Sequence, residues 1–146
     1  MSVERIVVDA SVAVKWRLRD ETELAQADAL SDNVAAGRIS LVVPTLFDYE
    51  VANVFKVAVV RQRISEADAF IALADFQAIP LERHEFPLLQ DAAFRLALRY
   101  QRSIYDAAYL VLAQAQNLKF YTGDKRLFNA VTNVFPWVKW IGDYPT

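Results

Sequence analysis

An α/β sandwich around a mostly parallel sheet is the fold class that this sequence predicts, and two observations support it. Short apolar segments alternate with longer helical ones along the whole chain. The first two apolar segments, residues 5–8 and 40–43, are continuous rather than alternating, as in strands buried on both faces. With 55% hydrophobic residues among 146, the chain has enough apolar surface for one substantial core. We therefore expect a single domain over residues 1–146.

Five segments are expected to form the strands of the sheet. Each is short, rich in apolar, β-branched or aromatic residues, and bounded by turn or helix signals. They are residues 5–8, 40–43, 79–81, 119–122 and 138–141. Pro80 has no backbone N–H to donate, which places the third segment at an edge of the sheet.

Helices are expected between these strands, and most carry a recognisable start or stop signal. Gly37 ends the first, Pro44 suits the first turn of the second, and Ser65 and Ser103 open later ones as N-caps. The expected helices are residues 21–36, 44–61, 65–78, 87–100 and 103–116. Further short helices are expected to follow the first and fourth strands.

The composition excludes several kinds of chemistry. The chain has no cysteine, which excludes disulfides, cysteine zinc sites and a thiol nucleophile. His84 is the only histidine, so multi-histidine metal sites are excluded as well. Three well-separated glycines leave no glycine-rich phosphate loop. Residues 1–5 carry an acid and a base where a signal peptide needs an apolar stretch, so we expect a cytoplasmic protein with no membrane segment.

Four acidic residues stand at positions where chemistry is expected. Asp9 and Asp124 follow the first and fourth strands, and ligands bind beyond the carboxyl ends of strands in open parallel sheets. The alternative for each is a helix N-cap. Glu50 lies on an apolar stripe of its helix, with a surface salt bridge as its alternative. Asp106 belongs to a capping pattern at Ser103, but its helix is apolar nearly all round.

Together the four acids carry more weight than any one of them alone. Carboxylates gathered at one sheet edge raise each other's pKa and cannot all stay ionised without a cation. Mg²⁺ or Mn²⁺ accepts a few carboxylates together with waters. Such an ion would activate water and stabilise an in-line displacement at phosphorus. Spacing alone leaves open whether the four side chains converge.

Several segments resemble one family closely. They are VVDASVAVKW at residues 7–16, PTL at 44–46, EVAN at 50–53, SIYDAAY at 103–109 and TGDKRL at 122–127. In this order and spacing they resemble the motifs of PIN-domain proteins, and specifically the VapC toxins of toxin–antitoxin pairs. The resemblance spans nearly the whole chain, and its motifs are specific only in combination.

The resemblance implies a PIN-domain-like α/β/α sandwich with a central, mostly parallel five-stranded sheet, and a Mg²⁺- or Mn²⁺-dependent endoribonuclease. It also implies a homodimer, inhibited by a VapB-like antitoxin. On the family pattern the metal-binding acids are Asp9, Glu50, Asp106 and Asp124. Ser11, Asn53 and Thr122 match positions near the site.

Our hypothesis for the chemistry is hydrolysis of an RNA phosphodiester by water that the ion activates. Glu50 would bind the ion or orient the attacking water. Lys15 is a candidate for phosphate binding, but a solvated helix cation is the interpretation we favour. Cations adjoin the motifs, as at Lys125 and Arg126, which suits phosphate contact although the net charge is −2; solvated helix faces are the alternative.

Three other functions remain open at this point. The domain could be an inactive PIN-like module that binds a protein, with its acids serving as caps and salt-bridge partners. It could be a metal-dependent DNA or flap nuclease, although its small size disfavours a helical clamp. A phospho-acceptor domain normally needs an acidic pair at the first strand, and Ala10 follows Asp9 here. The helices over residues 44–61 and 65–78 carry more apolar residues than one core-facing stripe needs, which favours a dimer.

Overall fold

The computed structural model describes residues 2–146 and, within them, places five parallel strands in one sheet. The strands are β1 (Glu4–Val8), β2 (Ile39–Pro44), β3 (Leu81–His84), β4 (Lys119–Thr122) and β5 (Val138–Trp140). Their order across the sheet is β3-β2-β1-β4-β5. The expected α/β fold with a parallel sheet is therefore confirmed.

Seven α-helices and three short 3₁₀ helices lie between or after the strands within residues 2–146. The α-helices are α1 (Ala10–Ala13), α2 (Leu24–Ala35), α3 (Leu46–Val60), α4 (Glu66–Ala78), α5 (Gln90–Tyr100), α6 (Ile104–Gln116) and α7 (Lys125–Val131). The 3₁₀ helices are η1 (Val14–Trp16), η2 (Phe86–Leu88) and η3 (Ile141–Asp143). None of these helices is both long and apolar enough to cross a membrane.

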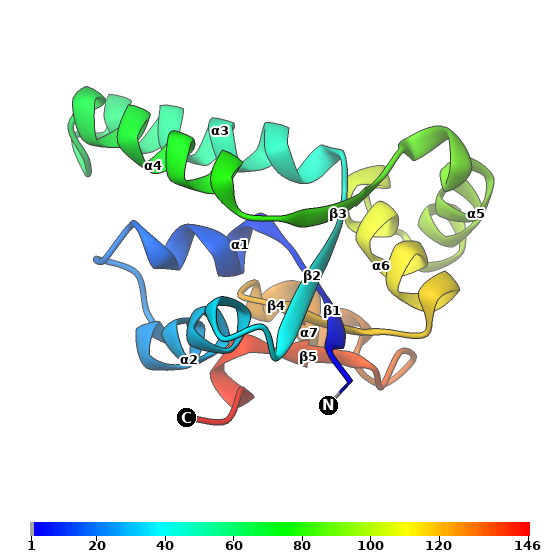
Figure 1. Ribbon diagram of the computed structural model, residues 1–146. Coiled ribbons are helices and arrows are strands. Elements are labelled where there is room, and N and C mark those ends of the chain that lie inside the picture. Colours follow the sequence, from blue (N-terminus) through cyan, green and yellow to red (C-terminus); the bar gives the residue numbers. More distant parts are fainter. Residues whose placement is uncertain (1) are drawn as a thin grey trace.

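The helices form layers around the sheet. Helix α6 packs against β1, β2 and β4, whereas α2 packs against β2. Figure 1 shows α2 and α6 on opposite sides of the strands, and α3 and α4 side by side above them. Because both faces of the sheet are covered, β1 and β2 have almost no exposed apolar side chain, which explains their continuous apolar sequences.

The register of the central strands brings two loops together. Val8 of β1 pairs with Tyr121 of β4 in a parallel ladder. Both strands therefore end at the same edge of the sheet, and the residues that follow each of them become neighbours. Asp9 comes directly after β1, and Thr122 ends β4. The start of α6 also lies at this edge, because Ile104 and Tyr105 line one cavity with Pro44, the last residue of β2.

Several element boundaries differ from the expected ones. Pro44 is the last residue of β2 and not the first turn of α3, which begins at Leu46. The ring of Pro44 removes a donor only at the end of the strand, where the ladder is already finishing. Strand β3 begins after Pro80 rather than containing it, although the prediction of an edge strand is confirmed. Ile141 leaves β5 and begins η3.

The two serine caps are confirmed. Ser65 Oγ accepts a hydrogen bond from the backbone N–H of Asp68 at 3.0 Å, and this bond begins α4. Ser103 Oγ accepts one from the N–H of Asp106, also at 3.0 Å, and begins α6. The second cap is important for function because it fixes where Asp106 enters the structure.

Candidate active site at the carboxyl edge of the sheet

Asp9 is the most buried acid of the candidate site. It follows β1, and only 8% of its surface is exposed. Its side chain accepts hydrogen bonds from two hydroxyls: Thr122 Oγ1 donates to Oδ2 at 2.6 Å, and Ser11 Oγ donates to Oδ1. Both hydroxyl residues were expected near the site, and both contact the acid that follows the first strand.

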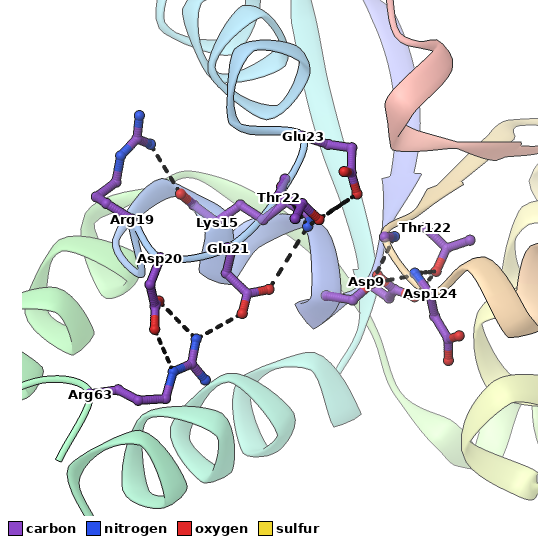
Figure 2. A network of polar contacts seen from close by, with 12 residues as sticks. Asp9, Lys15, Arg19, Asp20, Glu21, Thr22, Glu23, Arg63, Thr122 and Asp124 are labelled. Carbon is purple, nitrogen blue, oxygen red and sulfur yellow. Dashed lines mark hydrogen bonds and ion pairs between the residues drawn. The ribbon is translucent and has the colours of Figure 1, made fainter. Parts of the chain in front are cut away.

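The same hydroxyls tie the loop after β4 to the loop after β1. Ser11 Oγ accepts from the backbone N–H of Gly123 at 2.8 Å. Thr122 Oγ1 accepts from the backbone N–H of Asp124 at 3.0 Å. Asp124 is thereby linked to Asp9 through one threonine hydroxyl, and Figure 2 shows the three residues gathered at one place.

The surroundings of Asp9 disfavour its ionised form. The pKa of Asp9 is raised from 3.8 to about 6, mainly by burial and in smaller part by the negative charge of Glu50. The hydrogen bonds from Ser11 and Thr122 oppose these effects without cancelling them. A carboxylate with a raised pKa beside a second carboxylate is an environment that a cation would relieve.

Glu50 lies on α3 and is half-buried. Tyr109 of α6 donates its hydroxyl hydrogen to Glu50 Oε1 at 2.6 Å. Burial raises the pKa of Glu50, the hydrogen bond from Tyr109 lowers it, and the charge of Asp106 raises it again. Burial also raises the pKa of Tyr109, with the charge of Glu50 as the next cause, so Tyr109 acts as a donor at neutral pH. The surface salt bridge expected as an alternative for Glu50 is replaced by this hydrogen bond.

Asp106 lies in the first turn of α6, where the partial positive charge of the helix N-terminus favours a carboxylate. Its Oδ2 accepts a hydrogen bond from a terminal guanidinium nitrogen of Arg102 at 3.0 Å. Its charge also raises the pKa of Glu50, so the carboxylate of Asp106 lies within electrostatic reach of Glu50. Asp9, Glu50 and Asp106 therefore form a chain of electrostatically coupled carboxylates.

Asp124 is the N-cap of α7. Its Oδ1 accepts hydrogen bonds from the backbone N–H groups of Arg126 at 3.0 Å and Leu127 at 3.1 Å. The cap interpretation of this acid is thus confirmed for one of its two oxygens. Asp9 also occupies an N-cap position, before α1, but its carboxylate oxygens accept from Ser11 and Thr122 instead.

The last two residues expected near the site are Lys15, which is buried beside two glutamates, and Asn53, which is exposed. Lys15 is buried, and its Nζ donates to the backbone oxygen of Thr22 at 2.8 Å. The same atom lies 3.8 Å from Glu21 Oε1 and from Glu23 Oε1. Figure 2 shows this network, and the interpretation of Lys15 as a solvated helix cation is wrong. Asn53 is exposed on α3, one turn after Glu50.

The donor set fits a hard divalent cation held by few protein ligands. Carboxylate and hydroxyl oxygens are the ligand types that Mg²⁺ and Mn²⁺ prefer. Within residues 2–146, no three Asp, Glu or His side chains stand close enough together to hold one ion. Mg²⁺ usually keeps several waters and contacts one or two carboxylates directly. The side chains as they lie therefore suit an ion held by one or two acids, with water between it and the others.

Two features of this site were missed by sequence reasoning. Tyr109 was interpreted only as an apolar residue of α6, but it lies one turn after Asp106, where its hydroxyl can reach the same site.

The second feature is a pair of exposed tyrosines, Tyr49 and Tyr105, each of which directly precedes one of the acids. They line a cavity of about 330 Å³ that Phe86 and Ile104 also border. Such aromatic surfaces are typical of sites that bind unstacked bases.

Comparison with known proteins gives one family. The family model of the PIN domain matches residues 6–133 of this chain. Ribonuclease VapC9 of Mycobacterium tuberculosis is 35% identical over 122 residues, which cover 84% of this chain and 87% of that protein. Ribonuclease VapC12 of the same species is 31% identical over 122 residues, with coverage of 84% and 88%.

Two solved structures share the fold. The crystal structure of PAE2754 from Pyrobaculum aerophilum matches with a TM-score of 0.70 at 22% identity, covering 95% of this chain and 84% of that chain. VapC20 of Mycobacterium tuberculosis, described as a toxin that cleaves the sarcin–ricin loop, matches with a TM-score of 0.63 at 16% identity, covering 86% and 94%. At these identities the two structures show a common fold.

Proposed function

The chain belongs to the PIN-domain family, as its motifs predict, and from this membership we propose that it is a VapC-type endoribonuclease dependent on Mg²⁺ or Mn²⁺. The observation that carries the proposal is the coupled set of Asp9, Glu50 and Asp106 at the carboxyl edge of the sheet. Its substrate would be a cytoplasmic RNA. A catalytically inactive binding module and a DNA nuclease are the alternatives that the experiments below distinguish.

Each residue of the site has a proposed part in the reaction. Asp9 and Asp106 would hold the ion, and Asp124 would reach it through a water molecule with the carboxylate oxygen that does not cap α7. Ser11 and Thr122 hold the carboxylate of Asp9 in one orientation. When bound, the ion would supply a water of lowered pKa and would stabilise negative charge at phosphorus.

Glu50 would have a different task from the other acids. Its pKa is raised by burial and by the charge of Asp106, which makes it a better proton acceptor than an exposed glutamate. The hydroxyl of Tyr109 holds one of its oxygens, so the other is available to orient water toward a phosphodiester. Glu50 would therefore position the attacking water or contact the ion.

Metal dependence is tested with Mn²⁺ calorimetry and an RNA-cleavage assay on the wild type and Asp124→Asn. We expect the wild type to bind Mn²⁺ and the variant to lose most of that binding, because the substitution removes a negative charge beside the ion. Asparagine caps helices as well as aspartate does, so α7 and the fold should be unaffected. EDTA should abolish cleavage by the wild type, and added Mn²⁺ or Mg²⁺ should restore it.

The control is Asp91→Asn, which alters an exposed acid paired with Arg95. It should bind Mn²⁺ and cleave RNA like the wild type. Cleavage that persists in EDTA would contradict the metal dependence. Failure of the wild type to bind Mn²⁺ and to cleave any RNA would favour the binding module, whereas cleavage of DNA alone would favour the DNA nuclease.

The homodimer and the antitoxin partner are also part of the proposal. Several large apolar side chains are exposed on α3, α4 and the region of α5, namely Val60, Phe70, Ile71, Leu88, Phe94 and Leu98. Exposed apolar groups in such number are typical of protein–protein interfaces. A groove of about 270 Å³ between α3 and α4 is lined almost entirely by apolar side chains.

We expect the purified protein to be a dimer at micromolar concentration, because a second copy would cover the exposed apolar side chains of α3, α4 and α5. Size-exclusion chromatography with light scattering measures the mass directly. A monomer mass at that concentration would contradict the dimer and leave these surfaces for the antitoxin.

A further inference from the structure

Arg102 lies in the short connection between α5 and α6, and the backbone on both sides of it is fixed. Gln101 adopts a left-handed conformation with φ of 53°, and the N–H of Arg102 donates to the oxygen of Ala97 at 3.1 Å, which closes α5. Ser103 then caps α6. Two helix ends therefore hold the Cα of Arg102 beside the first turn of α6, where Asp106 lies.

Not every N–H group of the Arg102 guanidinium has a hydrogen-bond partner. One terminal nitrogen donates to Asp106 Oδ2 at 3.0 Å. The Nε–H is buried and has no hydrogen-bond partner among residues 2–146. A buried donor without a partner is unfavourable, and the charge of the guanidinium increases the cost. The free protein thus holds an arginine with a vacant donor next to an acid of the proposed active site.

A second arginine–aspartate pair shows that this arrangement is unusual. Arg95 and Asp91 on α5 are also four residues apart and also 3.0 Å from each other. Their side chains are 79% and 87% exposed, so the pair is an ordinary surface ion pair. The side chains of Arg102 and Asp106 are only 26% and 30% exposed. The difference lies in burial and in the proximity of Asp106 to Glu50.

A phosphodiester is the ligand chemistry that fits this arginine. The planar guanidinium presents parallel N–H groups that match two oxygens of one phosphate group. When the Arg102 side chain turns from Asp106 toward bound RNA, the two non-bridging oxygens of a phosphate would accept from Nε and from a terminal nitrogen together. That contact would give the Nε–H the partner that it lacks in the free protein.

We propose that Arg102 binds the RNA phosphate at the active site, exchanging its ion pair with Asp106 for this contact when RNA binds. The inference rests on the proposed function, because it names a substrate contact of the same site. In the free protein Arg102 competes with a cation for Asp106, and in the RNA complex Asp106 is released. Removal of Arg102 should therefore weaken RNA binding and strengthen Mn²⁺ binding, two effects of opposite sign.

RNA binding is measured by fluorescence anisotropy with a labelled pool of random single-stranded RNA, in EDTA, from ~50 to ~200 mM KCl. Arg102→Gln should weaken binding by about 10-fold, as expected for one lost charge-assisted contact. The slope of log K against log salt should fall by about 0.7, the value for one phosphate on a single strand. Arg102→Lys should keep the slope of the wild type and bind with intermediate affinity. Arg95→Gln is the matched control and should leave both quantities unchanged.

Calorimetry with Mn²⁺ supplies the second readout. Arg102→Gln should bind Mn²⁺ several-fold more tightly than the wild type, because a positive charge has been removed 3.0 Å from Asp106 Oδ2. Arg95→Gln should bind it like the wild type. A role that is only structural would weaken both kinds of binding together.

Either of two results with Arg102→Gln would overturn the inference. The first is an unchanged RNA affinity and salt slope, and the second is weaker Mn²⁺ binding. If Arg102→Gln does not fold, Arg102→Lys decides, since a lysine variant with lost salt dependence would also contradict a phosphate contact. If the wild type binds no RNA in EDTA but cleaves RNA with Mn²⁺, this inference fails and the proposed function stands, whereas a wild type that neither binds nor cleaves RNA contradicts both.

Discussion

Replacing Asp9 with Asn is expected to lower the rate of RNA cleavage by at least about 10³-fold, a larger loss than the 10–100-fold typical of groups that only support a metal ligand. The amide keeps the shape of the side chain and can still accept from Thr122, so the fold should be retained. What is lost is the negative charge at the centre of the coupled carboxylates. The measurement is the cleavage rate at saturating Mn²⁺ for the variant, the wild type and Asp91→Asn.

The same substitution is expected to stabilise the protein in EDTA. The pKa of Asp9 is about 6 in the folded state and 3.8 as an unperturbed carboxyl. Between these pH values the folded protein holds a proton that the unfolded chain has lost, so the free energy of unfolding decreases as pH rises. Above pH 6 the buried ionised carboxylate lowers the free energy of unfolding by ~3 kcal/mol, from the linkage relation. Asparagine does not ionise, so the variant does not lose this stability.

Urea unfolding in EDTA measures this effect. The stability advantage of Asp9→Asn over the wild type should grow by about 2–3 kcal/mol from pH 4 to pH 8, most of it below pH 7. Asp91→Asn should show no such growth, because its carboxylate is exposed. An advantage independent of pH would show that burial does not raise the pKa of Asp9. Full cleavage activity in Asp9→Asn would remove Asp9 from the site.

Replacing Gly123 with Ala is expected to disrupt the site through its backbone. A Cβ on Gly123 would lie 2.8 Å from the backbone oxygen of Ser11 and 3.0 Å from Cε of Lys15. The oxygen belongs to the backbone of α1 and moves only if that helix moves. Overpacking of this kind costs about 1–3 kcal/mol. The shift would also separate the loops that carry Asp9 and Asp124, and an error of about 1 Å can cost ~10²-fold in rate.

Gly37→Ala is the control for this variant. Gly37 has a φ of +74° and no atom within 4 Å of its Cβ position, so alanine there strains the backbone without touching the site. Both variants should lose stability, measured by urea unfolding, but only Gly123→Ala should lose cleavage activity under conditions where it is fully folded. Equal activity in the two folded variants would contradict the close approach of the two loops as a requirement for function.

The sequence by itself determined the order of strands and helices along the chain, and it identified the four acids as candidate site residues. Continuous apolar segments identified β1 and β2, because the side chains on both faces of a covered strand are buried and therefore apolar. Pro80 marked the edge of the sheet, and Ser103 marked the start of α6. These signals are local, because each depends on the backbone chemistry of a few neighbouring residues.

The tertiary structure alone decided which side chains meet. Tyr109 and Glu50 are 59 residues apart, and Thr122 and Asp9 are 113 apart, yet each pair is joined by a hydrogen bond. Periodicity in a sequence shows which face of a helix or strand is apolar, but it does not identify the helix or strand that packs against that face. The same limit explains Lys15, which the sequence suggested to be a solvated helix cation although the fold buries it. The electrostatics of the site follow from packing: burial raises the pKa of Asp9, and only the folded chain supplies that burial.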